Sequence, residues 1–330
     1  MSYVVLARKW RSAQFSAVVG QTHIVRTLSN AIRLNRVHHA YLFTGSRGIG
    51  KTSVARIYAK LLRCEQVRED GEYLATCDAC PACVEVTGGT SLDVLEIDGA
   101  SNNGVDAVRE LRDQARYMPA SGKRKIYIID EVHMLTTAAF NALLKTLEEP
   151  HEHVFFIFAT TEPQKLPATI LSRCQRFDFR RIPVAQIQSH LSEVCQRDGI
   201  TAEPGALTVI ARAAEGGMRD ALSLLDQVIA YSGGSVTVAT ARESVGLIGS
   251  QILFSVLKPT MARDPRTVVL AVTEAYRNGV DLRTLTHGLL EVLHAAILAK
   301  IGAPRETATE FSDEEWAEIH ALAALRDLEE

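Results

Sequence analysis

One stretch of sequence decides the fold: Tyr41-Leu42-Phe43-Thr44-Gly45-Ser46-Arg47-Gly48-Ile49-Gly50-Lys51-Thr52. Its apolar start predicts a buried strand, and after the glycine-rich loop a helical pattern runs from Ser53 to Leu62. Gly45 and Gly50, followed at once by Lys51 and Thr52, have the spacing of a phosphate-binding loop. The inward-facing N–H groups of such a loop, and the positive end of the helix after it, bind phosphate oxygens.

We therefore expect a nucleotide to bind here. Lys51 should contact the β- and γ-phosphates, and Thr52 should hold Mg²⁺. The remaining contacts should come from the rest of the loop and the start of the helix: Gly45, Ser46, Arg47, Gly48, Ile49, Gly50 and Ser53. A simple glycine-rich turn is the alternative, and the strand–loop–helix context argues against it.

The composition limits the classes of protein that this chain can be. It has 330 residues, of which 47% are hydrophobic and 23% are charged, which is enough for two or three domains with real cores. The net charge of −3 gives no overall basic field, so DNA contacts must come from a local patch or from several subunits together.

No apolar run approaches the roughly 20 residues of a membrane span, and the N-terminus lacks the order of a secretory signal. We expect a cytoplasmic protein whose six cysteines are not paired in disulfides.

Four of the cysteines form a C-x12-C-x2-C-x2-C pattern: Cys64, Cys77, Cys80 and Cys83. Four thiolates at such spacing suit a structural Zn²⁺ with no open coordination position. An iron–sulfur centre would normally have a further Cys-Pro, which is missing here, and three cysteines within seven residues argue against unligated packing. The sequence thus predicts a zinc module at 64–83, with the polar segment Glu65–Thr76 as a loop held by the metal. Cys174 and Cys195 stand alone and are expected to pack in the interior.

Another buried strand, Lys125–Glu131, ends in two acids, Asp130 and Glu131. In the presence of a phosphate loop we expect Asp130 to position Mg²⁺ and Glu131 to polarise the attacking water, although a strand can also simply end in acids at the surface. His133 is expected to pack or cap. A further buried strand, Val154–Ala159, leads to Thr161 at the edge where ligands bind in open α/β sheets.

Two other regions are less specific. Gln21 precedes a helix expected at His23–Leu34 with Thr22 as its cap, and it could flank an adenine base or simply begin an ordinary helix. Beyond residue 181 strands disappear from the pattern, and helices are expected near 184–197, 204–215, 218–231 and 237–245, with more helix over 250–330.

Taken together, these motifs resemble the clamp-loader group of AAA+ ATPases. The resemblance is strong over residues 1–230 and weaker over 245–330. It rests on the phosphate loop, Asp130-Glu131, Thr161, Ser172-Arg173-Cys174 and Met218-Arg219-Asp220, and on longer phrases such as 6–11, 130–135, 140–150 and 159–167.

The resemblance implies an architecture. It predicts an α/β class AAA+ P-loop domain with a parallel five-stranded sheet at 1–180, a helical lid at 181–246 and a helical collar for oligomerisation at 247–330. It also implies the zinc module, with a first gap that is longer than usual and should only lengthen a surface loop.

The resemblance also implies roles for individual residues. Thr161 falls at the sensor-one position near the γ-phosphate, and Arg219 at the sensor-two position of the lid, contacting nucleotide in the same subunit. Arg173 resembles the arginine finger that acts on ATP bound by the neighbouring subunit. Five N-terminal residues match the segment that lies against the adenine nucleotide: Ala7, Arg8, Arg11, Val18 and Val19.

The implied activity is ATP hydrolysis that drives the loading of a sliding clamp onto primed DNA during replication. The implied partners are delta and delta-prime subunits, further copies of this chain, the sliding clamp and primer–template DNA, in a pentameric hetero-oligomer. Members of the group often continue into a tail that binds polymerase and helicase, so we expect this chain to precede such a tail. Any polymerase activity would belong to the holoenzyme, because the chain lacks a convincing pair of metal-binding acids for nucleotide transfer.

Three alternatives remain open at this point. A delta-prime-like subunit shares the zinc and Ser-Arg-Cys features but usually has a degraded phosphate loop. A scaffold that binds ATP without hydrolysing it is opposed by Glu131 and Arg173. An unrelated AAA+ motor such as a Holliday-junction helicase is opposed by the cysteine spacing.

Overall fold

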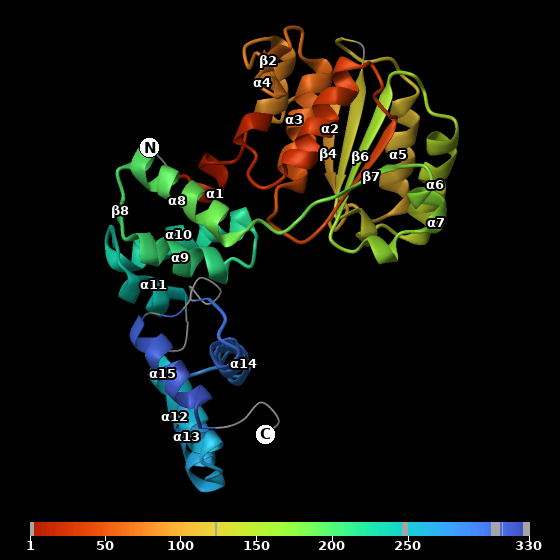
Figure 1. Ribbon diagram of the computed structural model, residues 1–330. Helices are drawn as coiled ribbons and strands as arrows, with labels where there is room; N and C mark the ends of the chain where they lie inside the picture. Colours follow the sequence, from red (N-terminus) through yellow and green to blue (C-terminus); the bar gives the residue numbers. More distant parts are fainter. Residues whose placement is uncertain (1–2, 123, 246–249, 305–310, 312, 326–330) are drawn as a thin grey trace. The chain divides into compact units, whose positions relative to one another are not determined.

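The computed structural model describes residues 3–122, 124–245, 250–304, 311 and 313–325 (Figure 1). The chain divides into two compact units. The first comprises Met1–Leu191 and Ala214–Ser223, and the second comprises Ser192–Ala213 and Leu224–Glu330.

The first unit is built on five parallel strands in the order β4-β5-β6-β1-β7, which confirms the predicted α/β fold with a parallel five-stranded sheet. The strands are β1 (Ala40–Thr44), β4 (Val94–Asp98), β5 (Lys125–Asp130), β6 (Val154–Thr160) and β7 (Gln175–Asp178). Every residue of β1 and β6 is buried, as expected for central strands covered on both faces. Because the strands are parallel, their carboxyl ends meet at one edge of the sheet, where the loops after β1, β5 and β6 lie together.

Helices cover both faces of this sheet (Figure 1). Alternate residues of β1 point to opposite faces: Phe43 packs into an apolar cluster with α2 and α3, whereas Leu42 packs with α5, α6 and α7. The helical segments of this unit are α1 (Leu6–Lys9), η1 (Phe15–Ala17), α2 (Thr22–Arg33), α3 (Lys51–Arg63), α4 (Pro81–Gly88), α5 (Val105–Ala115), η2 (Val132–Met134), α6 (Thr137–Glu148), η3 (Pro163–Lys165) and α7 (Ala168–Leu171).

The segment predicted as a zinc-held loop is more ordered than expected. It contains a two-stranded antiparallel hairpin, β2 (Arg68–Asp70) and β3 (Tyr73–Ala75), in which Asp70 is paired with Tyr73. The tight turn places Gly71 at a φ of 60°, a conformation that glycine adopts without strain. The two loop residues are Gly71 and Glu72, and glycine at the first loop position is the local signal for this hairpin.

The start of α2 also differs from the prediction. Thr22 is the first helical residue, Gln21 is the N-cap, and no side chain caps the helix. The Gln21 side chain bonds instead to the backbone of Arg180. Similarly, α3 begins at Lys51 rather than Ser53, because Gly50 takes the left-handed conformation at its N-cap.

The second unit is helical. The helices assigned to this part of the chain are α8 (Val184–Asp198), α9 (Pro204–Ala213), α10 (Met218–Ser232), α11 (Val238–Val245), α12 (Ser250–Met261), α13 (Pro265–Arg277), α14 (Leu282–Lys300) and α15 (Asp313–Ala323), and the division between units passes through α8 and α10. Strands are present here, contrary to expectation: β8 (Thr201–Ala202) and β9 (Ser235–Val236) form a short parallel pair. Two-residue strands are too short to produce an alternating pattern in the sequence.

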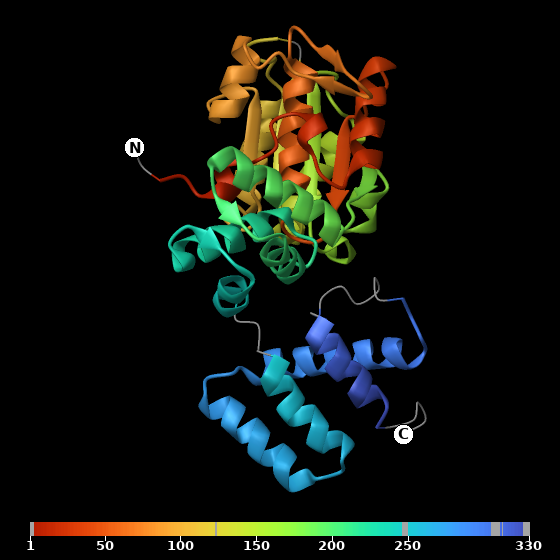
Figure 2. The ribbon, with the colours of Figure 1, turned by 60° about the vertical axis from the view of Figure 1, so that its left-hand side comes forward.

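Helices α12 to α15, coloured blue in Figure 2, share one apolar core. Its buried side chains include Phe254, Leu257, Leu285, Val292 and Ile319. Among the residues that the structure describes, none of the helices combines the length and hydropathy needed for a membrane span.

Candidate nucleotide-binding site and cysteine cluster

The phosphate loop joins β1 to α3, and two of its glycines are required by close contacts. A Cβ on Gly45 would lie 2.8 Å from the carbonyl oxygen of Phe179, and a Cβ on Gly48 would lie 2.6 Å from Oδ2 of Asp220. Both residues have positive φ angles, 138° and 76°. The loop can therefore approach its neighbours only with glycine at these positions.

Lys51 and Thr52 begin α3 and face the loop. The Lys51 side chain is buried, and its Nζ donates hydrogen bonds to the carbonyls of Gly45 at 2.7 Å and Ser46 at 2.8 Å. Burial lowers the pKa of Lys51, and the nearby carboxylates of Glu131 and Asp130 oppose this shift in part.

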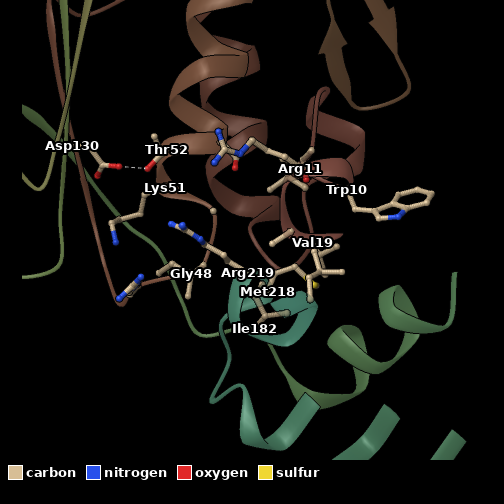
Figure 3. Close-up of a pocket in the computed structure, with 18 of the residues that line it drawn as sticks. Trp10, Arg11, Val19, Gly48, Lys51, Thr52, Asp130, Ile182, Met218 and Arg219 are labelled. Carbon is tan, nitrogen blue, oxygen red and sulfur yellow. Dashed lines mark hydrogen bonds between the residues drawn. The ribbon is translucent and has the colours of Figure 1, made fainter. Parts of the chain in front are cut away.

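Thr52 lies beside the first of the predicted acids. Its hydroxyl donates to Oδ2 of Asp130 at 2.6 Å (Figure 3). The pair places a hydroxyl oxygen and a carboxylate together at the end of β5, and oxygen ligands of this kind are those that Mg²⁺ prefers.

Glu131 has an unusual backbone conformation that aims its side chain. It follows β5 with φ and ψ both at 45°, a left-handed conformation that non-glycine residues adopt at some energetic cost. Gly99 packs against it so closely that a Cβ there would lie 2.7 Å from the Glu131 carbonyl oxygen. The carboxylate accepts a hydrogen bond from the Thr161 hydroxyl at 3.1 Å. The structure thus brings together the two residues predicted as catalytic base and sensor.

A cavity of about 490 Å³ opens beside these groups, a volume in the usual range of small-molecule sites (Figure 3). The predicted residues that line it are Ala7, Arg11, Val18, Val19, Arg47, Gly48, Ile49, Gly50, Lys51, Thr52, Ser53, Asp130, Glu131 and Arg219. Four of the residues assigned by prediction to the nucleotide of the same subunit are not among its lining: Arg8, which is exposed, and Gly45, Ser46 and Thr161, which act on the lining residues through their contacts with Lys51 and Glu131.

The cavity also has lining residues that sequence reasoning missed: Trp10, Ser12, Asp98, Ile182, His190, Met218 and Leu222. Asp98 ends β4, next to Asp130 in the strand register, so its place at the carboxyl edge was a usable signal. No local pattern indicates Ile182 or His190, because they reach the cavity only through the tertiary fold.

Positive side chains gather at the cavity. Arg11 and Arg219 come from opposite ends of the first unit's sequence, and Figure 3 shows Arg219 extending toward the phosphate loop. The backbone N–H of Arg219 donates to the carbonyl of Gly48 at 3.1 Å, which ties the start of α10 to the loop. Burial is the main cause that lowers the pKa of Arg11, and the charges of Arg56 and Arg219 act in the same direction. A polyanion would relieve the repulsion among these cations.

Gln21 bonds to a neighbouring backbone segment and does not flank an adenine site. Its fully buried side chain donates to the Arg180 carbonyl at 2.7 Å and accepts from the Arg180 N–H at 3.2 Å. It holds the segment that precedes Ile182 in place and is not among the residues that line the cavity.

Arg173 lies apart from the cavity, on the surface. Its guanidinium is 2.8 Å from a Glu148 carboxylate oxygen and donates to the Thr169 carbonyl at 2.7 Å. It does not line the cavity of its own chain.

The four clustered cysteines come together as predicted. The Sγ atoms of Cys64, Cys77, Cys80 and Cys83 all lie within 4.8 Å of one another, and all are free thiols. Hydrogen bonds from the backbone N–H groups of Ala79 and Cys80 lower the pKa of Cys77 to about 6, which favours the thiolate form that binds metal. The donor set and its spacing fit a tetrahedral Zn²⁺. Cys174 is partly buried and Cys195 is buried, as expected for packing residues.

The cysteine cluster is braced by a polar network next to it. Lys60 forms a 2.6 Å ion pair with Asp78, and Gln14 donates to the hydroxyl of Thr76 at 2.8 Å. Gln14 lies just beyond the cavity-lining residues Arg11 and Ser12 in sequence, so this network connects the cluster to the N-terminal segment.

Comparisons with known proteins agree along most of the chain. A family model described as DNA polymerase III, delta subunit, matches residues 20–183. A model of the DNA polymerase III clamp loader subunit, ATPase lid domain, matches residues 186–234, and one of DNA polymerase III subunits gamma and tau domain III matches residues 236–329.

Curated relatives are similar over most of the chain. DNA polymerase III subunit tau of Escherichia coli is 45% identical over 301 residues, which are 91% of this chain and 46% of that protein. The tau subunit of Bacillus subtilis is 45% identical over 300 residues, covering 91% and 53%. This chain therefore spans about half the length of these two relatives. DNA polymerase III subunit gamma of Buchnera aphidicola subsp. Baizongia pistaciae is 40% identical over 301 residues, covering 91% and 80%.

Solved structures support the fold. The RuvB Holliday junction branch migration motor of Thermotoga maritima aligns with a TM-score of 0.54 and 17% identity, over 94% of this chain and 91% of that one. At such low identity the likeness shows a shared fold alone. The sequence matches are far closer, and the chain belongs to the family of DNA polymerase III gamma and tau subunits.

Proposed function

We propose that this chain is an ATPase subunit of the bacterial clamp loader, which uses ATP binding and hydrolysis to load the sliding clamp onto primed DNA. The observation that carries the proposal is the cavity at the carboxyl edge of the sheet. It combines an intact phosphate loop, the Thr52–Asp130 pair and the aimed carboxylate of Glu131. A delta-prime-like subunit or a non-hydrolysing scaffold would not need all three.

In this proposal ATP lies with its phosphates along 45–53, and Lys51 exchanges its carbonyl partners for the β- and γ-phosphates. Thr52 and Asp130 would hold Mg²⁺, which would neutralise charge on the phosphate oxygens. Glu131 accepts a proton from the attacking water, Thr161 orients Glu131, and Arg219 contacts the nucleotide from the lid. Ala7, Arg11, Val18 and Val19 would lie against the nucleoside.

Arg173 is proposed to act in trans. Its surface position, away from its own cavity, suits a guanidinium offered to the nucleotide of a neighbouring subunit. Its ion pair with the exposed Glu148 is of the kind that contributes little to stability, so it can be exchanged for a phosphate contact.

The proposal extends to domains and partners. Residues 1–180 would form the nucleotide-binding domain with a zinc module at 64–83, residues 181–246 the lid, and residues 247–330 the collar. The partners would be delta and delta-prime subunits, further gamma or tau copies, the sliding clamp and primer–template DNA, in a pentameric assembly. A cytoplasmic location follows from this role at replicating DNA.

The test is the ATPase rate of the chain alone and then with its loader subunits, sliding clamp and primed DNA. We expect a slow rate alone and a strong stimulation by the complete set. In a Lys51→Ala variant, ATP affinity or turnover should collapse while the melting temperature does not fall. Stimulated hydrolysis at the wild-type rate in this variant would refute the phosphate-loop assignment, and a wild-type chain that binds ATP but never hydrolyses it would favour the scaffold.

A further inference from the structure

His133 occupies a position that the roles assigned so far do not explain. It lies in η2, the single turn directly after Glu131, and its side chain is 6% exposed. The turn is closed by the N–H of Met134, which donates to the Glu131 carbonyl at 2.9 Å. This closure folds the imidazole back against the end of β6, so that it lies between the loop after β5 and the loop after β6.

Both ring nitrogens face acidic side chains. Nδ1 is 3.3 Å from Oε2 of Glu131, and Nε2 is 3.3 Å from Oε1 of Glu162. Nδ1 is also 3.0 Å from the hydroxyl of Thr160, whose oxygen accepts the N–H of Glu162. Nδ1 therefore lies between the Thr160 hydroxyl and Glu131, whereas Nε2 faces Glu162.

The contacts on Glu131 are specific to one of its oxygens. The Thr161 hydroxyl and Nδ1 of His133 both approach Oε2, from the ends of two different segments. Neither contact involves Oε1, and Glu131 lines the nucleotide cavity. The Thr161 hydrogen bond and the adjacent Nδ1 of His133 both act on Oε2, and this leaves the other oxygen to accept a proton from water, as a general base must.

We propose that His133 is a positioning residue for ATP hydrolysis: it holds Oε2 of Glu131, together with Thr161, so that Oε1 faces the attacking water. The inference rests on the proposed function, because it requires Glu131 to act as the base. In this arrangement Nδ1 positions the base, and Nε2 makes a separate contact with Glu162.

Conservative substitutions can distinguish the contributions of the two ring nitrogens. The side-chain amide nitrogen of asparagine lies at the same bond distance from Cα as Nδ1, and that of glutamine at the same bond distance as Nε2. A His133→Asn variant can therefore keep a donor for Glu131, whereas His133→Gln can keep one only for Glu162. A residue that merely packs would tolerate the two amides about equally.

The experiment measures ATP hydrolysis and nucleotide affinity for this chain assembled with its loader subunits, clamp and primed DNA. His133→Ala should lower kcat about 10- to 100-fold, the size expected for one hydrogen bond to a charged group, with nucleotide affinity nearly unchanged. His133→Asn should regain most of this loss, and His133→Gln should not. A matched control is His153→Ala, because His153 lies at the other end of β6 and bonds to the carbonyl of Ala115 at 3.1 Å; its turnover should equal that of the wild type.

A second measurement keeps the inference testable if His133→Ala folds poorly. In a Glu131→Gln background, adding His133→Asn or His133→Gln should cause no further loss of turnover, since the base is already gone. Equal activity of the two amide variants, an unchanged kcat in all three, or a further loss in the Glu131→Gln background would overturn the inference. If the wild-type assembly itself fails to hydrolyse ATP, the proposed function is wrong and this inference falls with it.

Discussion

Replacing Asp93 by alanine should sharply destabilise the first unit, because Asp93 neutralises a buried arginine. It lies 3.0 Å from the guanidinium of Arg63, and both side chains are 2% exposed. The Asp93 carboxylate also accepts the backbone N–H groups of Ala120 at 2.8 Å and Ser121 at 2.9 Å. The Ser121 hydroxyl donates to Oδ2 at 3.3 Å as well, so the substitution removes the acceptor for four donors at once.

The size of the effect follows from the charge that is left behind. Breaking a buried pair by removing one partner costs about 3–5 kcal/mol. Arg63 still donates to the carbonyl and hydroxyl of Ser121 at 3.0 and 2.7 Å, which places the loss near the lower end, about 3 kcal/mol. For a domain of this size that corresponds to a fall of about 6–12 °C in Tm.

The assay is urea unfolding followed by the fluorescence of Trp10 in a Trp316→Phe background, so that the signal reports the first unit. The matched control is Asp106→Ala, which breaks an exposed pair with Arg109 at 3.1 Å and should change stability little. A loss in Asp93→Ala no larger than that in Asp106→Ala would refute the reasoning.

The pH dependence provides a second check on Asp93. Burial alone would raise the pKa of its carboxyl, but the N–H groups of Ser121 and Ala120, together with Arg63, outweigh burial and lower it. A carboxyl whose pKa is lowered in the folded state adds stability above its ordinary value of about 4 and loses that contribution as the pH falls through the folded value. The wild type and Asp93→Ala should therefore become more alike in stability as the pH falls below about 4.

Three further predictions concern function. Glu131→Gln keeps the shape of the side chain but removes the base, so it should bind ATP and hydrolyse it poorly; stimulated turnover at the wild-type rate would exclude Glu131 from the mechanism. Arg173→Ala subunits should bind ATP normally, and in mixed assemblies the site that loses activity should be the one beside the mutant subunit; a defect that follows the mutant's own nucleotide would contradict action in trans. The protein purified without chelators should contain one Zn²⁺ per chain, and Cys83→Ser should lower this content; metal-free wild-type protein would rule out the zinc module.

Much of the first unit could be predicted from local pattern. The strands β1, β5 and β6 were found because each is a short, nearly continuous apolar run, as central parallel strands require. The phosphate loop and Asp130-Glu131 have fixed spacings that the chemistry demands. The cysteine cluster was predictable for the same reason, since thiolates must converge on a metal. The boundaries were less accurate: α3 begins two residues before the predicted start, because the N-cap was set by the left-handed Gly50.

What the sequence could not supply is the set of contacts made across long separations. Ile182 and Leu222 reach the cavity only because the segments after β7 and at the start of α10 fold back over the phosphate loop. Gln21 could equally have faced a ligand, and only its bonds to Arg180 decide the matter. The place of His133 depends on the left-handed turn at Glu131, which no local pattern announces.

The burial of Lys51 has a consequence for stability. Folding already removes water from its ammonium group. When a phosphate binds, Lys51 therefore gives up its two hydrogen bonds to backbone carbonyls and donates to phosphate oxygens, and no water has to be removed from the cation. The lowered pKa means that the charged lysine opposes folding, and this opposition weakens as the pH rises through the lowered pKa toward the ordinary value. Without nucleotide the first unit is therefore less stable than its packing alone would allow. A Lys51→Met variant should melt at a higher temperature than the wild type, and addition of ATP should not raise its melting temperature further. Such a loss of stability in exchange for affinity is expected at a preorganised binding site.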